Sequence, residues 1–152
     1  MTHTPAAENA SSERMLNDKK VKDFVRRLFT SIGDEGQDKD LIKAAVVGYT
    51  LAHQSDERAF VLKTEATGTY VYVHVVCPSM PFLQDSLVMY LREKAYQNIL
   101  ALSLFIDDTA QDARQYLLIR LLHHQDDDIS KLDKLFENNL EETKSELKKI
   151  NS

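Results

Sequence analysis

The sequence predicts an α+β protein in which two helices precede an antiparallel sheet. Apolar residues first recur at the spacing of an amphipathic helix, and from about residue 58 they alternate with a period of two. From Tyr70 onward the expected order is strand, helix, strand, strand, helix. With one further strand this is the ferredoxin-like βαββαβ arrangement. The further strand comes either from beyond Ser152 or from the strand expected within residues 58–66.

The first helix is expected over residues 21–32, where apolar side chains follow one face and Gly33 provides a stop signal. A second helix begins near Asp38 or Asp40 and ends near Gln54, and its alanines and Gly48 favour a close approach between helices. The two predict a helical hairpin over residues 15–56. The small and polar residues 1–14 predict a disordered tail.

The sheet is expected within residues 57–152. The stretch 69–77 is apolar on both faces, which is typical of a central strand that is covered on both sides. A helix follows over residues 79–94, with Leu83, Leu87 and Leu91 on its buried side. Strands are expected at 98–106 and 113–122, and a long amphipathic helix begins near Asp128.

The composition excludes several classes of function. The chain has 152 residues and a net charge of −5, so it repels nucleic-acid phosphates. No apolar run approaches the roughly 20 residues that a membrane-spanning helix needs. The N-terminus lacks a signal pattern, and Cys77 is the only cysteine. We therefore expect a cytoplasmic protein that binds neither nucleic acid nor membrane.

A catalytic site is not visible in the sequence. Cys77 closely precedes a helix start, which would lower the pKa of a thiol, but its strand partners are valines and His74 lies on the opposite face. A buried core thiol is therefore favoured. Asp85 and Ser86 lack the Gly-x-Ser-x-Gly context of a nucleophile, and adjacent helical residues do not face each other.

Metal and nucleotide sites are not expected either. His123 and His124 are neighbours on a strand and so point to opposite faces, and Asp126–Asp128 fit the start of a helix. The glycines are scattered, without a phosphate-binding loop. We predict no catalytic residues, no metal ligands and no cofactor in this chain.

The junction between the central strand and the next helix carries the most distinctive residues. Ser79 fits an N-cap, and Pro81 fits the first turn of a helix. Asp85 suits the positive end of the helix dipole. Backbone N–H groups at such an end can hold an anion, including an amino-acid carboxylate.

The same residues carry a family resemblance. The segment Met80-Pro81-Phe82-Leu83-Gln84-Asp85-Ser86 resembles the Met-Pro-Phe-Leu-x-Asp-Ser signature of the large bacterial NAD-specific glutamate dehydrogenases. In that family the signature lies in the first ACT-like domain, near the N-terminus. The similarity extends over most of residues 18–148.

The resemblance implies a noncatalytic regulatory or assembly domain, with NAD bound only by a downstream catalytic domain. It implies contact with those downstream domains, or with an amino-acid effector, through residues 77–86. The candidate contact residues are Ser79, Met80, Pro81, Phe82, Asp85 and Ser86. The alternative is a stand-alone ACT-like module that senses an amino acid or self-associates through a sheet edge or its C-terminal helix.

Overall fold

The structure is a computed structural model that describes most of the predicted elements. It describes residues 15, 17–30, 38–54, 61–67, 70–78, 83–94, 96, 98–106, 114–122, 134, 137, 138 and 141. The chain divides into two compact units, Met1–Ser55 and Asp56–Ser152. The predicted tail over residues 1–14 and most of the predicted C-terminal helix lie outside the described residues.

The first helix of the first unit is α2, Lys19–Leu28. Asp18 caps it, because its carboxylate accepts a hydrogen bond from the backbone N–H of Lys20 at 2.8 Å. The helix ends earlier than the apolar spacing predicts. Phe29 has left the helical conformation, with ψ at 6°, and the hydroxyl of Thr30 donates to the carbonyl of Arg26 at 3.0 Å. Gly33 lies outside the described residues.

The second helix of this unit is α3, Lys39–Gln54, and the predicted bounds are confirmed. Asp38 caps it by accepting from the N–H of Asp40 at 2.9 Å. Within the unit, the ring of Phe24 on α2 meets the ring of Tyr49 on α3 edge to face, with centroids 5.4 Å apart. Gly48 is buried, as the expectation of close packing requires.

The second unit is built on a four-stranded sheet in which every neighbouring pair is antiparallel. Its strands lie in the order β1-β2-β4-β3. They are β1 Val61–Thr67, β2 Tyr70–Pro78, β3 Leu100–Phe105 and β4 Arg114–Leu122.

This order answers the question of the missing strand. β1, predicted within residues 58–66, occupies the edge beside β2. β2 is central and buried along nearly its whole length, as its two apolar faces predict. The arrangement is α+β and compatible with a ferredoxin-like fold, with β1 in the position of the final strand.

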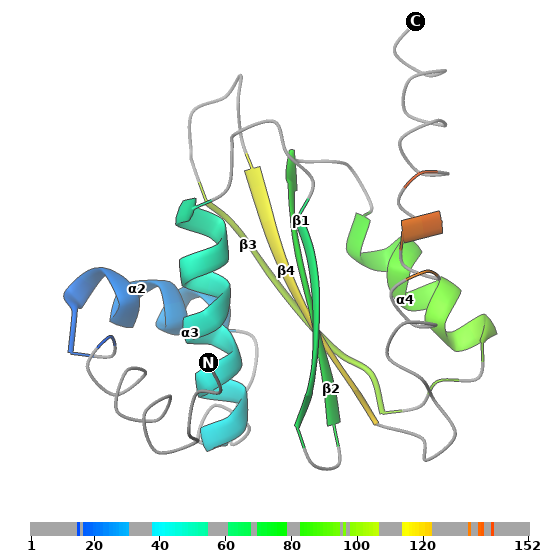
Figure 1. Ribbon diagram of the computed structural model, residues 1–152, viewed down its shortest axis with the longest axis horizontal. Helices are drawn as coiled ribbons and strands as arrows, with labels where there is room; N and C mark the ends of the chain where they lie inside the picture. The colour runs from blue at the N-terminus through cyan, green and yellow to red at the C-terminus, as the bar shows by residue number, and fades with distance from the viewer. Residues whose placement is uncertain are drawn as a thin grey trace, which may run out of the picture. The chain divides into compact units, whose positions relative to one another are not determined.

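The core of the second unit lies between the sheet and α4, Leu83–Glu93. α4 covers one face of the sheet (Figure 1). Leu83, Leu87 and Leu91 are at most 1% exposed, so the predicted apolar stripe is confirmed. The sheet contributes Val71, Val73, Val75, Cys77, Leu117, Ile119 and Leu121 to this core.

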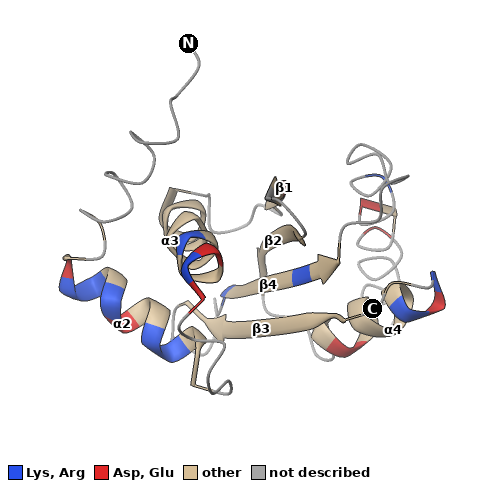
Figure 2. Cartoon of the chain, turned by 90° about the horizontal axis from the view of Figure 1, so that it is seen from below, with Lys and Arg blue, Asp and Glu red and all other residues tan. Residues whose placement is uncertain are grey.

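Charge is distributed unevenly over the elements. Lysine, arginine and acidic residues colour α2 and α4, whereas β2 and β3 carry none of them (Figure 2). Burial of these two strands therefore places no Lys, Arg, Asp or Glu side chain of theirs in the core. Among the described residues, no helix is long and apolar enough to cross a membrane.

Candidate functional site

The predicted contact site is only partly within the described residues. Ser79, Met80, Pro81 and Phe82 lie outside them, and the two remaining candidates lie in the first turns of α4. Asp85 and Ser86 are both exposed, on the side of the helix away from the buried leucines. Within the described part of the chain, neither side chain forms a hydrogen bond or an ion pair. The carboxylate and the hydroxyl can therefore meet a group outside this domain.

Gln84, between the buried and the exposed parts of the motif, has a structural role. Its side-chain carbonyl accepts a hydrogen bond from the hydroxyl of Ser103 at 2.7 Å. Its amide nitrogen donates to the backbone carbonyl of Ala101 at 3.5 Å. Both partners are on β3, so Gln84 fixes α4 to the edge of the sheet.

Cys77 is fully buried in the core between α4 and the sheet. Successive side chains of a strand point to opposite faces, so the side chain of His74 lies on the opposite face of β2 from that of Cys77. The prediction of a core thiol is confirmed. A thiol with no exposed surface cannot act as a nucleophile on a dissolved substrate.

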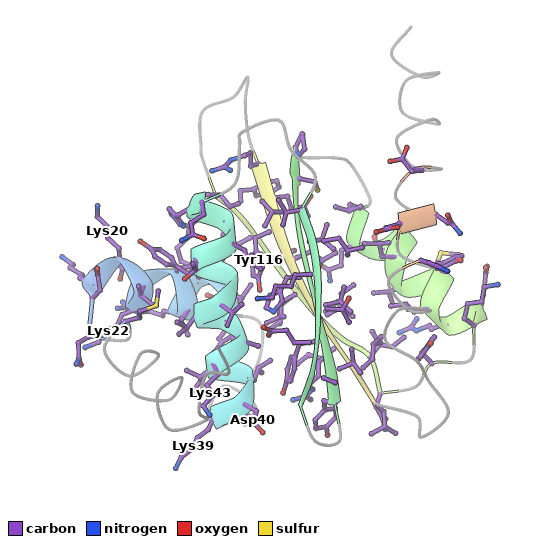
Figure 3. All side chains as sticks on the ribbon, viewed as in Figure 1. Lys20, Lys22, Lys39, Asp40, Lys43 and Tyr116 are labelled. Carbon is purple, nitrogen blue, oxygen red and sulfur yellow. The ribbon has the colours of Figure 1, made fainter. Side chains whose placement is uncertain are left out.

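A buried polar network on that other face was not predicted from the sequence. Nδ1 of His74 lies 2.8 Å from the hydroxyl of Tyr116, which is labelled in Figure 3. Nε2 of His74 lies 3.3 Å from a carboxylate oxygen of Glu65. The network joins β1, β2 and β4 side by side. His74 stands out in an apolar strand, but the sequence does not reveal the strand register that brings its partners to it.

The electrostatics of the network follow from this geometry. The hydrogen bond from His74 lowers the pKa of Glu65, against the opposing effect of burial, and Lys63 adds to the lowering from 3.4 Å away. Burial raises the pKa of Tyr116 well above its usual value, and the charge of Glu65 adds to that rise. At neutral pH the carboxylate is therefore ionised and the phenol is neutral. Nε2–H can donate to Glu65 while Nδ1 accepts from the tyrosine hydroxyl.

This network resembles a proton relay in its connectivity, and of its three side chains Glu65 is partly exposed, at 30%. His74 and Tyr116 are both 0% exposed. Catalytic acids and bases must reach a bound substrate within hydrogen-bond distance. We therefore assign the network to holding the three strands together.

The lowered pKa of Glu65 predicts a specific loss of stability in acid. A carboxyl group whose pKa is lower in the folded than in the unfolded chain stabilises the fold at pH values above its unfolded pKa, which is about 4.3 for glutamate. This stabilisation is lost as the pH falls through the folded pKa. Urea unfolding at a series of pH values should show Glu65→Gln less stable than the wild type at pH 7. That difference should shrink below about pH 4.3. A difference that stays constant down to pH 2.5 would contradict the assignment.

Metal ligation has no support in the described part of the chain. No group of three or more His, Cys, Asp or Glu residues lies together there in a way that could hold an ion. His123, His124 and Asp126–Asp128, which were weighed as ligands, lie outside the described residues.

Comparison with known proteins adds no relative: no family model, no curated protein and no solved structure matches this chain. The fold and the placement of the side chains define the class, an α+β domain with a ferredoxin-compatible antiparallel sheet.

Proposed function

We propose that this chain is a noncatalytic regulatory or assembly domain of the kind found in the N-terminal part of the large NAD-specific glutamate dehydrogenases. The complete enzymes of that family oxidatively deaminate L-glutamate to 2-oxoglutarate with NAD, in a catalytic domain far downstream. In this proposal the sheet unit is an ACT-like domain, residues 15–56 form a helical hairpin that leads into it, and the protein acts in the cytoplasm.

One observation carries the proposal: the motif divides into a part that builds the domain and a part that faces outward. Leu83 is buried in the core, and Gln84 is bonded to β3. These two residues hold the start of α4 firmly against the sheet. Asp85 and Ser86 follow directly and remain exposed.

A pair of polar groups on a rigid element suits a contact site. Groups held on packed helices need little ordering when they bind, so less of the binding free energy is lost. The carboxylate of Asp85 can accept from a cation or a backbone N–H of a neighbouring domain, and the hydroxyl of Ser86 can both donate and accept. The carboxylate of Asp85 can also bind the ammonium group of an amino acid.

The double substitution Asp85→Ala and Ser86→Ala tests the contact. We expect it to weaken association with the catalytic region of glutamate dehydrogenase from the same organism by roughly 10- to 100-fold, the worth of a hydrogen bond to a charged group. Isothermal titration calorimetry measures the affinity. Glu93→Ala is the matched control, because Glu93 is also an exposed acidic residue of α4 but lies in its last turn. Equal affinities for all three proteins would exclude the contact.

A stand-alone module that senses an amino acid is the second candidate, favoured by the exposed carboxylate and hydroxyl at the start of α4. This function predicts that at least one of the twenty common amino acids raises the thermal midpoint of the isolated chain by several degrees at millimolar concentration. The double variant should lose that rise. No shift with any amino acid would contradict the sensing function.

A further inference from the structure

The exposed side of α2 carries more positive charge than any other described helix or strand. Five of its ten residues are Lys or Arg, all five are exposed, and Asp23 is its one acidic residue. Figure 2 shows the basic residues in blue along the helix. The cationic face of α2 consists of Lys19, Lys20, Lys22, Arg26 and Arg27.

The packing of α2 turns this face outward. The buried residues of the helix are Val21, Phe24 and Leu28. The ring of Phe24 meets the ring of Tyr49 edge to face, so the apolar side of α2 is held against α3 within the first unit. At 100° per residue, the five basic residues fall on the opposite side of the helix. An amphipathic helix binds a membrane by burying its apolar side among the lipids, and in α2 that side is already covered.

The lysines lie where the helix itself disfavours them. Lys19, Lys20 and Lys22 are close to the N-terminal end of α2, whose first turn has no acidic residue. The helix dipole places a positive partial charge at this end, and it repels cations. Within the described part of the chain, none of the three ammonium groups has an ion-pair partner. In Figure 3 the side chains of Lys20 and Lys22 project away from α2 and not toward α3. An arrangement that costs stability without a compensating contact in the fold is typical of a functional surface.

The distribution of charge along the chain indicates the kind of partner. Residues 1–55 contain eight basic and eight acidic residues, whereas residues 56–152 contain 11 basic and 16 acidic residues. The net charge of −5 therefore belongs to the second unit. A large polyanion such as nucleic acid or an anionic membrane experiences the charge of the whole chain, which is negative. A short acidic segment can contact α2 alone, where the charges are complementary.

We propose that the cationic face of α2 binds an acidic segment of a partner protein, in which several Asp or Glu residues lie within about 15 Å, the length of ten helical residues. Carboxylates opposite the three lysines relieve the repulsion at the start of the helix. Arg26 extends the contact, because its side chain remains 78% exposed while it lies 3.2 Å from Asp23. This surface belongs to the first unit and goes beyond the proposed function, which concerns α4 alone.

A fluorescein-labelled peptide of ten glutamates tests this surface on the full chain by fluorescence anisotropy. We expect saturable binding at about 50 mM salt, and its loss at about 500 mM, where exposed charges are screened. A peptide of ten glutamines should not bind. The triple variant Lys19→Gln, Lys20→Gln, Lys22→Gln should bind the glutamate peptide about tenfold more weakly or worse, because three exposed ion pairs are lost together.

The matched control removes three exposed charges outside the cationic face. The variant Arg92→Gln, Lys94→Gln, Lys134→Gln changes the net charge by the same amount, so the long-range repulsion of the peptide is equal in both triple variants. This control should bind as the wild type does. Equal losses in the two triple variants would show that binding follows net charge alone, and would overturn the proposal.

The stability of the lysine variant gives a second readout. Removing cations from the positive end of α2 should leave the chain folded and raise its thermal midpoint by about 1–4 °C. Weaker binding together with a higher midpoint separates loss of the surface from loss of the fold. A fall in the midpoint would mean that the lysines stabilise the fold, and would contradict the argument from the helix dipole.

Two further outcomes would overturn the proposal. One is the absence of binding of the glutamate peptide at a concentration of 100 micromolar. The other is tighter binding of vesicles that contain phosphatidylserine, or of duplex DNA, than of the peptide. Neither Asp85 nor Ser86 is changed in these experiments, so failure here leaves the proposed contact at α4 standing, and failure of that contact leaves this surface standing.

Discussion

Leu87→Ala is expected to lower the free energy of unfolding by about 3 kcal/mol, which for a chain of this size corresponds to a fall of roughly 6–12 °C in the thermal midpoint. Leu87 is 0% exposed and lies in the middle of the stripe that packs α4 on the sheet. Truncation to alanine removes buried methyl groups and leaves a cavity that close-packed neighbours fill only in part. Differential scanning calorimetry together with urea unfolding measures both quantities.

Met89→Ala is the matched control on the same helix. Met89 is 61% exposed, so its truncation should change the free energy of unfolding by no more than about 0.5 kcal/mol. Similar losses for the two variants would mean that α4 does not pack through its leucine stripe. The motif would then no longer be held against the sheet, and the division between its buried and exposed residues would be lost.

Tyr116→Phe is expected to lower the free energy of unfolding by about 1–3 kcal/mol, although it removes a single oxygen atom. The hydroxyl lies 2.8 Å from Nδ1 of His74, and both side chains are fully buried. Without it, Nδ1 remains away from water with its hydrogen-bonding capacity unmet. Urea unfolding at pH 7 gives the difference.

A double-mutant cycle isolates the contact between the two rings. His74→Phe alone removes the same hydrogen bond to Tyr116 and also the contact with Glu65, so it should cost at least as much. The double variant His74→Phe with Tyr116→Phe removes both partners of this hydrogen bond at once, so neither ring is left with an unpaired group facing the other. Its loss should fall short of the sum of the single losses by at least about 1 kcal/mol. Strict additivity would show that the hydrogen bond contributes nothing to stability.

The strands and helices of this chain could largely be predicted from periodicity, because burial imposes a repeat on each kind of element. The alternation over residues 69–77 and the leucine stripe of α4 are both found in the structure. The end of α2 was misplaced, since the apolar spacing continues past Leu28 while the backbone turns at Phe29. The side chain of Thr30 donates a local hydrogen bond at the end of the helix, and the spacing of apolar residues carries no information about such a bond.

Contacts between distant residues could not be predicted, because they depend on strand register. The sequence left open whether the fourth strand came before or after the others, and only pairing of β1 with β2 decides it. The same register brings Glu65 and Tyr116 to His74 from two different strands. A histidine in an apolar strand is the one sign of this network that the sequence carries.

The candidate site was predicted as a segment, and the structure separates its residues by role. The sequence assigned Asp85 and Ser86 to a contact, and both are exposed. It gave no role to Gln84, whose bonds to Ser103 and Ala101 require knowledge of where β3 lies. Long side chains at a helix surface acquire such roles from tertiary packing alone.

The most direct test of the central claim is a binding measurement between this chain and the catalytic region of glutamate dehydrogenase from the same organism. The two purified proteins are mixed and followed by isothermal titration calorimetry, with the Asp85→Ala, Ser86→Ala variant in parallel. The proposal predicts saturable binding of the wild type and binding by the variant that is weaker by at least tenfold. Absence of binding by the wild type at a concentration of 100 micromolar would contradict the assignment to that enzyme.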